Sequence, residues 1–128
     1  MHLKEWLIKF VEYKASFRNQ TSQITEEEGL VKVVNSSQRT NYLVCEDLKN
    51  FDASLNADVC ACLNTKSNVL FLHDNWDEFI SLNTSFLFVN PKTKEHWSIK
   101  PKFHNVIAER KELKTGLLSL MEGVTVYD

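Results

Sequence analysis

The sequence contains few of the residues that favour turns and interrupt helices and strands. Only three glycines and two prolines occur in 128 residues. This scarcity excludes collagen-like and linker-like chains. It also excludes glycine-rich phosphate-binding loops, because no two glycines lie close enough to form one. No stretch approaches the roughly 20 consecutive apolar residues of a membrane-spanning helix, so we expect no membrane partner.

The chain also has little net charge and few cysteines. Fifteen basic residues against seventeen acidic residues give a net charge of −2. This balance excludes a strongly basic domain whose whole surface coats nucleic acid. Three cysteines cannot form a complete set of disulfides, and the first residues lack the apolar core of a secretory signal. We therefore expect a cytoplasmic protein with free, buried thiols.

The residues that are present have the composition of a folded domain. Hydrophobic residues make up 43% of the chain and charged residues 25%, which is the usual globular balance and excludes general disorder. The length is that of one typical domain. We expect a single α+β domain over residues 1–128.

Hydrophobic periodicity predicts a long amphipathic helix near each end of the chain, over residues 3–18 and 105–121. The second helix has a predicted apolar seam of Val106, Leu113, Leu117, Leu120 and Met121. A polar loop is expected at 19–23, and a short helix at 74–82. Runs rich in β-branched and aromatic residues predict strands at 30–34, 42–45, 59–63, 69–72, 86–89 and 95–99.

This order offers few parallel crossovers, which favours hairpins over a doubly wound sheet. We therefore expect an α+β two-layer sandwich with a mostly antiparallel sheet. Its N- and C-terminal helices should pack on one face, because each has one apolar seam.

Two patterns in the sequence bear on metal-dependent chemistry. Cys60 and Cys62, even with Cys45 nearby, have a one-residue gap in a strand, which does not aim two sulfurs at one ion. We expect buried cysteines, no metal and no cofactor.

Glu46, Asp47 and Lys49 form an acidic residue–any residue–lysine pattern at the end of a predicted strand. The pattern is similar to the catalytic half-motif of metal-dependent nucleases of the restriction-endonuclease type. In those enzymes carboxylates hold Mg²⁺ and the lysine stabilises charge at the phosphate. Asp58 is the positional candidate for the further carboxylate. The other interpretation is a polar strand end that leads into a loop.

Charge is distributed unevenly along the chain. Residues 46–78 contain seven acidic and two basic residues, whereas residues 92–114 contain seven basic and three acidic residues. The hairpin at 92–102 offers candidates for partner or phosphate binding, which are Lys92, Lys94, His96, Lys100 and Lys102. Lysines on an exposed edge strand also prevent aggregation and need no ligand.

These observations favour a non-catalytic protein-binding domain of the interaction, adaptor or chaperone-like kind, because no catalytic motif outweighs its structural explanation. The expected partner is another protein, and a homodimer is an option because segments of opposite charge can associate. The alternatives are a metal-dependent nuclease that uses Glu46, Asp47, Lys49 and Asp58, and a nucleic-acid-binding module that uses the basic hairpin.

Overall fold

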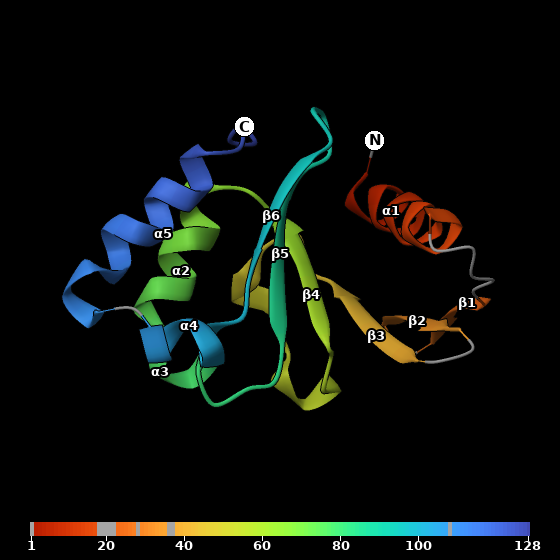
Figure 1. Cartoon of the computed structure of the whole chain (residues 1–128), viewed down its shortest axis with the longest axis horizontal. Helices are drawn as coiled ribbons and strands as arrows, with labels where there is room; N and C mark the ends of the chain where they lie inside the picture. Colours follow the sequence, from red (N-terminus) through yellow and green to blue (C-terminus); the bar gives the residue numbers. More distant parts are fainter. Residues whose placement is uncertain (1, 18–22, 28, 36–37, 108) are drawn as a thin grey trace.

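A computed structural model describes residues 2–17, 23–27, 29–35, 38–107 and 109–128. A six-stranded sheet runs through the molecule, and helices cover both of its faces (Figure 1). The elements in chain order are α1 (Leu3–Phe17), β1 (Gln23–Glu27), β2 (Leu30–Val34), β3 (Arg39–Val44), η1 (Leu48–Asn50), η2 (Ala53–Leu55), β4 (Val59–Leu63), α2 (Lys66–Asp74), α3 (Trp76–Phe79), β5 (Ser85–Asn90), β6 (Glu95–Ile99), α4 (Pro101–Ile107), η3 (Arg110–Glu112) and α5 (Leu113–Glu122).

The strands lie in the sheet in their sequence order, from β1 to β6. The β1–β2, β2–β3 and β5–β6 pairs are antiparallel, whereas β3–β4 and β4–β5 are parallel. The sheet is therefore mixed, with three antiparallel pairings out of five. The predicted α+β class is confirmed, and so is the mostly antiparallel sheet.

The two terminal helices lie on opposite faces of the sheet, so the expected two-layer arrangement with both helices on one face is wrong. α1 packs in one hydrophobic core with Ala61 of β4, whereas α2 and α5 pack in a second core with Cys60 and Cys62. Figure 1 shows α1 on one side of the strands and α2 and α5 on the other. Successive side chains of β4 point to alternate faces, so its run of apolar residues requires a cover on both.

Residues 69–72, predicted as a strand, belong to helix α2. The side chain of Thr65 caps this helix by accepting a hydrogen bond from the backbone N–H of Asn68 at 3.2 Å. Val69 and Leu72, three residues apart, are fully buried on the same helix face. A short apolar run fits a helix or a buried strand equally well, and the parallel β4–β5 pair needs a crossover here.

The helix predicted over 105–121 is two helices separated by η3. α4 begins at Pro101, where the missing N–H costs no hydrogen bond, and α5 begins at Leu113. The break changes which side chains are covered. Val106 and Leu120, expected on the packed seam, are 81% and 41% exposed, whereas the other three seam residues are buried as expected.

Most of the remaining predicted elements are confirmed with small shifts of their ends. The first helix, the hairpins of β2–β3 and β5–β6, and strand β4 lie where the pattern predicted them. The short helix expected at 74–82 is α3, which covers four residues. Gln23, expected in a loop, begins β1, and residues 19–22 of that loop lie outside the described part of the chain.

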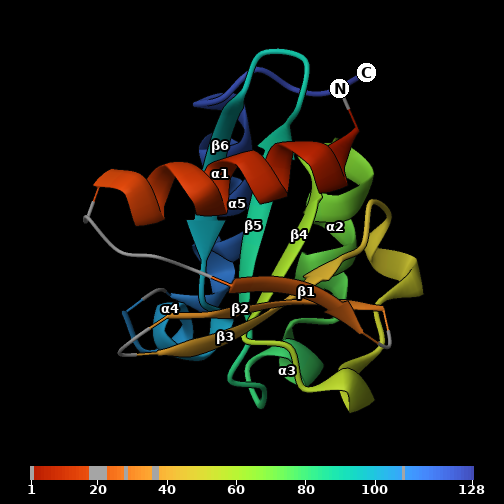
Figure 2. The same cartoon turned by 90° about the vertical axis from the view of Figure 1, so that its right-hand side faces the viewer.

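The position of α1 on the sheet determines which of its aromatic rings are covered. Trp6, Leu7 and Val11 are buried against the strands, whereas Tyr13 is 69% exposed and Phe17 is 81% exposed. Figure 2 shows α1 running across β4, β5 and β6, with its C-terminal end beyond β6. The sheet therefore supports the first part of α1 and not the last turn.

Two further expectations from composition concern membranes and thiols. Within the described part of the chain, no helix is both long and apolar enough to cross a membrane. Cys45, Cys60 and Cys62 are buried and carry free thiols, as predicted.

Candidate interaction surface

A groove opens between α1 and the β5–β6 hairpin. Its walls are the side chains of Trp6, Lys9, Phe10 and Tyr13 from α1 and those of Lys94 and His96 from the hairpin. The cavity has a volume of about 320 Å³. We call it the α1–β6 groove. It brings the N-terminal helix together with part of the basic hairpin, although some 80 residues of sequence separate them.

Three aromatic rings in mutual contact form the inner wall of the groove. The rings of Trp6 and Phe10 stack with centroids 4.8 Å apart and planes 13° apart. The His96 ring contacts both of them, at 5.4 Å from Trp6 and 5.0 Å from Phe10. These contacts hold α1 against the edge strand and fix an apolar surface at the base of the groove.

Two more aromatic rings extend this surface into solvent. Tyr13 lies one turn after Phe10, and Phe17 follows one turn later, with its ring centroid 6.5 Å from that of Tyr13. Both rings are mostly exposed because α1 reaches past the last strand here. Contiguous exposed apolar side chains often mark binding sites, and aromatic residues are enriched at protein interfaces relative to the rest of the surface.

The polar lining of the groove is basic. Lys9 and Lys94 both line it, and none of its six lining side chains is acidic. Lys14 adds a third ammonium group, 5.3 Å from the centre of the Phe10 ring. The groove therefore combines an aromatic wall with positive charge at its rim, which suits a partner that carries apolar and acidic groups together.

The five basic residues proposed from the sequence do not act as one patch. Lys94 and His96 line the groove, but the other three lysines contact different parts of the molecule. Lys92 donates a hydrogen bond to the C=O of Asp128 at 2.9 Å, and Lys102 donates one to Asn83 at 3.0 Å. The ammonium group of Lys100 lies 4.5 Å from the centre of the Phe103 ring.

The structure does not gather the four residues of the nuclease alternative. Asp58 precedes β4 and accepts a hydrogen bond from the N–H of Asn41, near the start of β3. Glu46 follows the end of β3, where its C=O accepts from the N–H of Leu63. Because β3 and β4 are parallel, these contacts place Asp58 and Glu46 at opposite ends of the strands, about five residues or 17 Å apart.

The other two residues of that alternative have local structural roles. Asp47 caps η1 by accepting from the N–H of Lys49 at 3.1 Å, and it also forms an ion pair with the Lys49 side chain at 3.4 Å. Among the residues that the structure describes, no group of three His, Cys, Asp or Glu side chains is placed to hold a metal ion. The interpretation of this segment as a polar strand end is therefore the better one.

The thiols lie beside this strand end. Cys45 lines a cavity of about 380 Å³ that also contains Glu46, Asp47 and Asp52. A hydrogen bond with Cys60 lowers the pKa of Cys45, and the same bond together with burial raises the pKa of Cys60 well above its usual value. Burial likewise raises the pKa of Cys62. We therefore expect Cys45 to be the most reactive of the three thiols.

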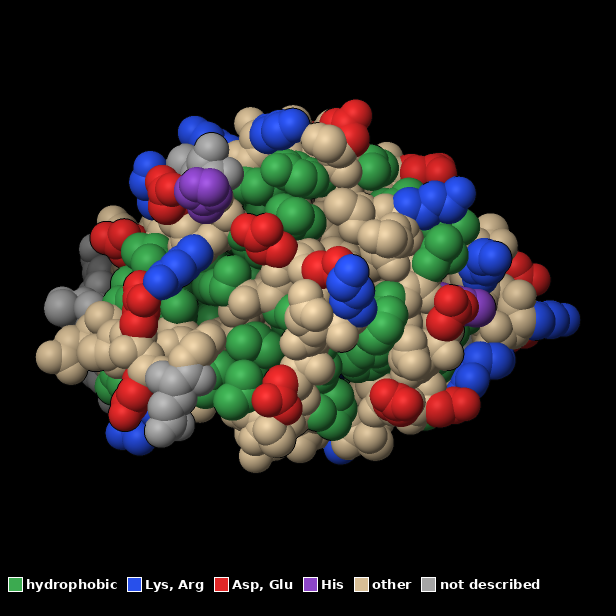
Figure 3. Space-filling model, turned by 180° about the vertical axis from the view of Figure 1, so that it is seen from behind, with side chains coloured by type: hydrophobic (Ala, Val, Ile, Leu, Met, Phe, Trp, Pro, Cys, Tyr) green, Lys and Arg blue, Asp and Glu red, His purple; other side chains and the backbone are tan. Residues whose placement is uncertain are grey.

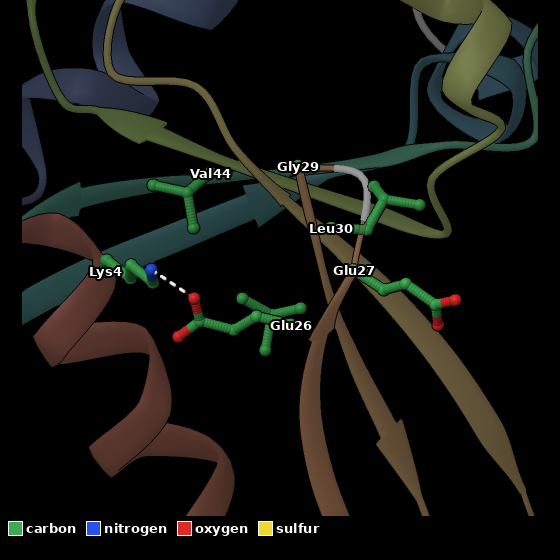
Figure 4. A pocket seen from close by; sticks show the side chains of 7 residues that line it. Lys4, Glu26, Glu27, Gly29, Leu30 and Val44 are labelled. Atoms are coloured by element: carbon green, nitrogen blue, oxygen red, sulfur yellow. Dashed lines mark hydrogen bonds and ion pairs between the residues drawn. The ribbon is translucent and has the colours of Figure 1, made fainter.

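A further hollow, of about 410 Å³, lies between α1 and the β1–β2 hairpin. Figure 4 shows Lys4 on α1 and Glu26 on β1 pointing toward one another, and their side chains form an ion pair. Glu27 is paired with Lys32 at 3.1 Å. Each of the three charged side chains that line this hollow thus has an ion-pair partner. Among the described residues, no such pair involves the two lysines of the α1–β6 groove.

The uneven charge along the sequence does not produce a face of one sign in the view from behind. Figure 3 shows acidic and basic side chains interspersed there, with separate hydrophobic patches between them. The acidic and basic segments of the sequence therefore do not form separate charged faces on this side of the molecule. The groove, rather than a whole face, is the surface with distinct chemistry.

Comparisons with known proteins add nothing to this description. No family model matches the chain, and neither a curated protein nor a solved structure matches it. The interpretation of the groove therefore rests on its geometry.

The sequence pattern indicated Lys94 and His96 as candidates, but it did not indicate the aromatic side of the groove, which is formed by Trp6, Phe10, Tyr13 and Phe17. It assigned the aromatic residues of the first helix to one packed face, because their spacing is that of a core stripe. The signal in the sequence is the extent of that stripe, which places four large rings at helical spacing over residues 6–17.

Proposed function

We propose that this protein is a non-catalytic, cytoplasmic protein-binding domain and that the α1–β6 groove is its binding surface. The observation that carries the proposal is the pair of exposed rings, Tyr13 and Phe17, which continue the aromatic wall of the groove. They lie beside the two groove lysines, which have no ion-pair partner among the described residues. A partner protein that carries apolar and acidic side chains has the matching chemistry.

Covering the exposed rings with a partner contributes free energy to binding, because apolar surface is removed from water. Burying a large apolar side chain contributes about 1.5–3 kcal/mol. Tyr13 and Phe17 obtain little of this in the free chain, because most of each ring is in water. Tyrosine and other aromatic residues are also enriched among the residues that dominate binding energy at interfaces.

Nucleic acid is the second candidate for the same groove, because bases stack on aromatic rings and phosphates attract lysine. Two observations favour a protein. The faces of Trp6 and Phe10 are already stacked on one another, and three of the five basic residues of the hairpin have other contacts. A partner that needs a few apolar anchors and a few acidic groups is better matched than a long polyanion.

The proposal is tested by photo-cross-linking in the cells from which the protein comes. A benzophenone amino acid replaces Tyr13 in one variant and Val106 of α4 in a control variant, since Val106 is at least as exposed. We expect the Tyr13 variant to give a discrete adduct that protease destroys and nuclease does not, and the Val106 variant to lack it. Adding K9E and K94E to the Tyr13 variant should reduce the adduct.

Other outcomes would contradict the proposal. A nuclease-sensitive adduct at Tyr13 would assign the groove to nucleic acid. An adduct formed equally from both positions, or from neither, would remove the groove as a specific binding surface. An adduct with twice the mass of the chain would identify a second copy as the partner, which is the homodimer option.

A further inference from the structure

Strand β6 is the last strand of the sheet as the structure describes it, so no described strand lies beside one row of its backbone groups. The C=O of Val89 accepts a hydrogen bond from the N–H of Asn64, on the β4 side. In an antiparallel pair a residue turns its N–H and C=O to the same side, so the backbone of Val89 faces β4 and not β6. Its partner on β6 is His96, whose backbone groups therefore point to the free edge.

The same geometry repeats two residues further along. Leu87 also faces β4, and its partner on β6 is Ser98. The N–H and C=O groups of His96 and Ser98 are thus directed outward in the row that a further strand would use. Trp97 lies between them in the sequence, and its backbone groups point toward β5, where its partner is Phe88. The rings of these two residues stack with centroids 4.3 Å apart.

The end of α1 extends past the free edge of β6 by about the distance between two neighbouring strands. Phe10 contacts His96 of β6, and Tyr13 is three residues further along the helix. Three residues of α-helix rise about 4.5 Å. Neighbouring strands in a sheet are about 4.8 Å apart. Because α1 runs across β6 and beyond it (Figure 2), a strand added beside β6 would lie beneath Tyr13.

We propose that the partner binds as an extended segment that adds a seventh strand to the sheet at β6, beneath the end of α1. This inference rests on the proposed function and names the manner of binding. The outward N–H and C=O groups of His96 and Ser98 pair with the backbone of the segment. Tyr13 covers one of its side chains.

The side chains near this edge define the chemistry of the segment. Lys94 and His96 line the groove, Ser98 shares the face of His96, and Lys9 approaches from α1. The side chains of the added strand also alternate between faces. On the α1 side the segment should therefore carry an apolar residue beneath Tyr13 and acidic residues two positions away.

Strand β6 of a second copy does not suit the same edge. In a two-fold antiparallel pair, residues opposite each other lie on the same face. A pair centred on Trp97 places Lys94 opposite Lys100, and one centred on Ser98 places His96 opposite Lys100. A pair centred on His96 places this ring opposite its own copy. Each β6–β6 arrangement opposes lysine or histidine side chains, so we place a segment of a different, acidic protein at this edge.

The test uses twelve-residue random peptides displayed on phage and selected on the full chain. We expect enriched peptides with acidic and apolar residues at alternating positions. Their synthetic forms are then measured by fluorescence anisotropy against the wild type, Ser98→Pro and Ser98→Ala. Proline removes the outward N–H at an edge position without removing a bond to β5, whereas alanine retains that N–H. Binding should weaken at least tenfold in Ser98→Pro and stay within twofold in Ser98→Ala.

A second measurement decides the question if Ser98→Pro does not fold, as judged by circular dichroism. The selected peptide is methylated on its backbone nitrogens, at odd positions in one version and at even positions in the other. Because alternate N–H groups of a strand point to opposite sides, one version should keep its affinity and the other should lose it. Equal affinity of the two versions, or loss of both, would overturn strand addition.

The remaining outcomes are also decisive. Peptides that bind folded Ser98→Pro as tightly as the wild type, peptides rich in basic residues, or no enrichment at all would each overturn the inference. If the cross-linker at Tyr13 still captures a protein, the proposed function stands and only the strand geometry is wrong. Tighter binding of a 20-nucleotide single-stranded RNA than of any peptide, lost in K94E, would contradict both proposals.

Discussion

Asn64 is the polar side chain whose removal should damage the fold most, because it is fully buried between two parts of the chain. Its amide nitrogen donates to the C=O of Met121 and to that of Thr125, each at 3.2 Å. Its amide oxygen accepts from the indole nitrogen of Trp97 at 2.8 Å. One side chain thus joins the end of β4 to β6 and to the end of α5.

The cost of Asn64→Ala follows from the groups left behind. The C=O of Thr125 keeps the amide of Asn90 as a donor, and that of Met121 keeps the N–H of Val124, so each loses one bond of about 1 kcal/mol. The buried indole N–H of Trp97 loses its partner, which costs about 1–3 kcal/mol. The free energy of unfolding should therefore fall by about 3–5 kcal/mol.

Urea unfolding followed by circular dichroism measures this change, with an unchanged m-value as evidence that the same transition is observed. Asn83→Ala is the control, because Asn83 is exposed and should change the free energy by less than about 0.5 kcal/mol. Trp97→Phe keeps the ring that stacks on Phe88 but removes the N–H. It should cost about 1–3 kcal/mol by leaving the Asn64 oxygen without a donor.

The double variant gives the sharper test of this reasoning. With both groups removed, neither the indole N–H nor the amide oxygen is left buried without a partner. Asn64→Ala with Trp97→Phe should therefore cost clearly less than the sum of the two single changes. Strict additivity, or an Asn64→Ala cost equal to that of Asn83→Ala, would refute the account of this network.

Three other predictions concern thiols, aromatic rings and a helix cap. Iodoacetamide should modify Cys45 well before Cys60 and Cys62 in the native protein, because the raised pKa of the latter two moves thiolate formation to higher pH. Peptide mass spectrometry over pH 7–9 measures the order of modification, and equal rates at the three thiols would contradict the prediction. Tyr13→Ser and Phe17→Ser should each change the free energy of unfolding by less than about 0.5 kcal/mol, whereas Trp6→Ala should cost about 3–5 kcal/mol in the same urea assay. Thr65→Ala should cost about 1 kcal/mol by removing the cap of α2, and Thr65→Ser should restore most of it.

The elements that sequence predicted well are those whose pattern is local. In β6 the buried residues Trp97 and Ile99 alternate with exposed His96 and Ser98, so one face and its period are visible in five residues. The repeated apolar positions of α1 are equally local. Such patterns need no knowledge of the rest of the chain.

The elements that sequence predicted poorly depend on connections over longer distances. Residues 69–72 are apolar in succession, which suits a buried strand or a helix face, and only the parallel β4–β5 pair determines that a helix is required. The layering is similar. Each terminal helix has one apolar seam, but the seam does not specify the face of the sheet on which it lies.

The groove could be predicted only in part for a related reason. Lys94 and His96 followed from alternation in the hairpin, but the aromatic wall depends on where α1 meets the edge of the sheet. A helix of 15 residues is about 22 Å long, whereas three strands are about 14 Å wide. A helix that crosses β4, β5 and β6 must extend beyond them at one end. Because Leu3 and Leu7 are buried at the start of α1, the overhang falls at Tyr13 and Phe17, where rings spaced like a core stripe have no strand beneath them.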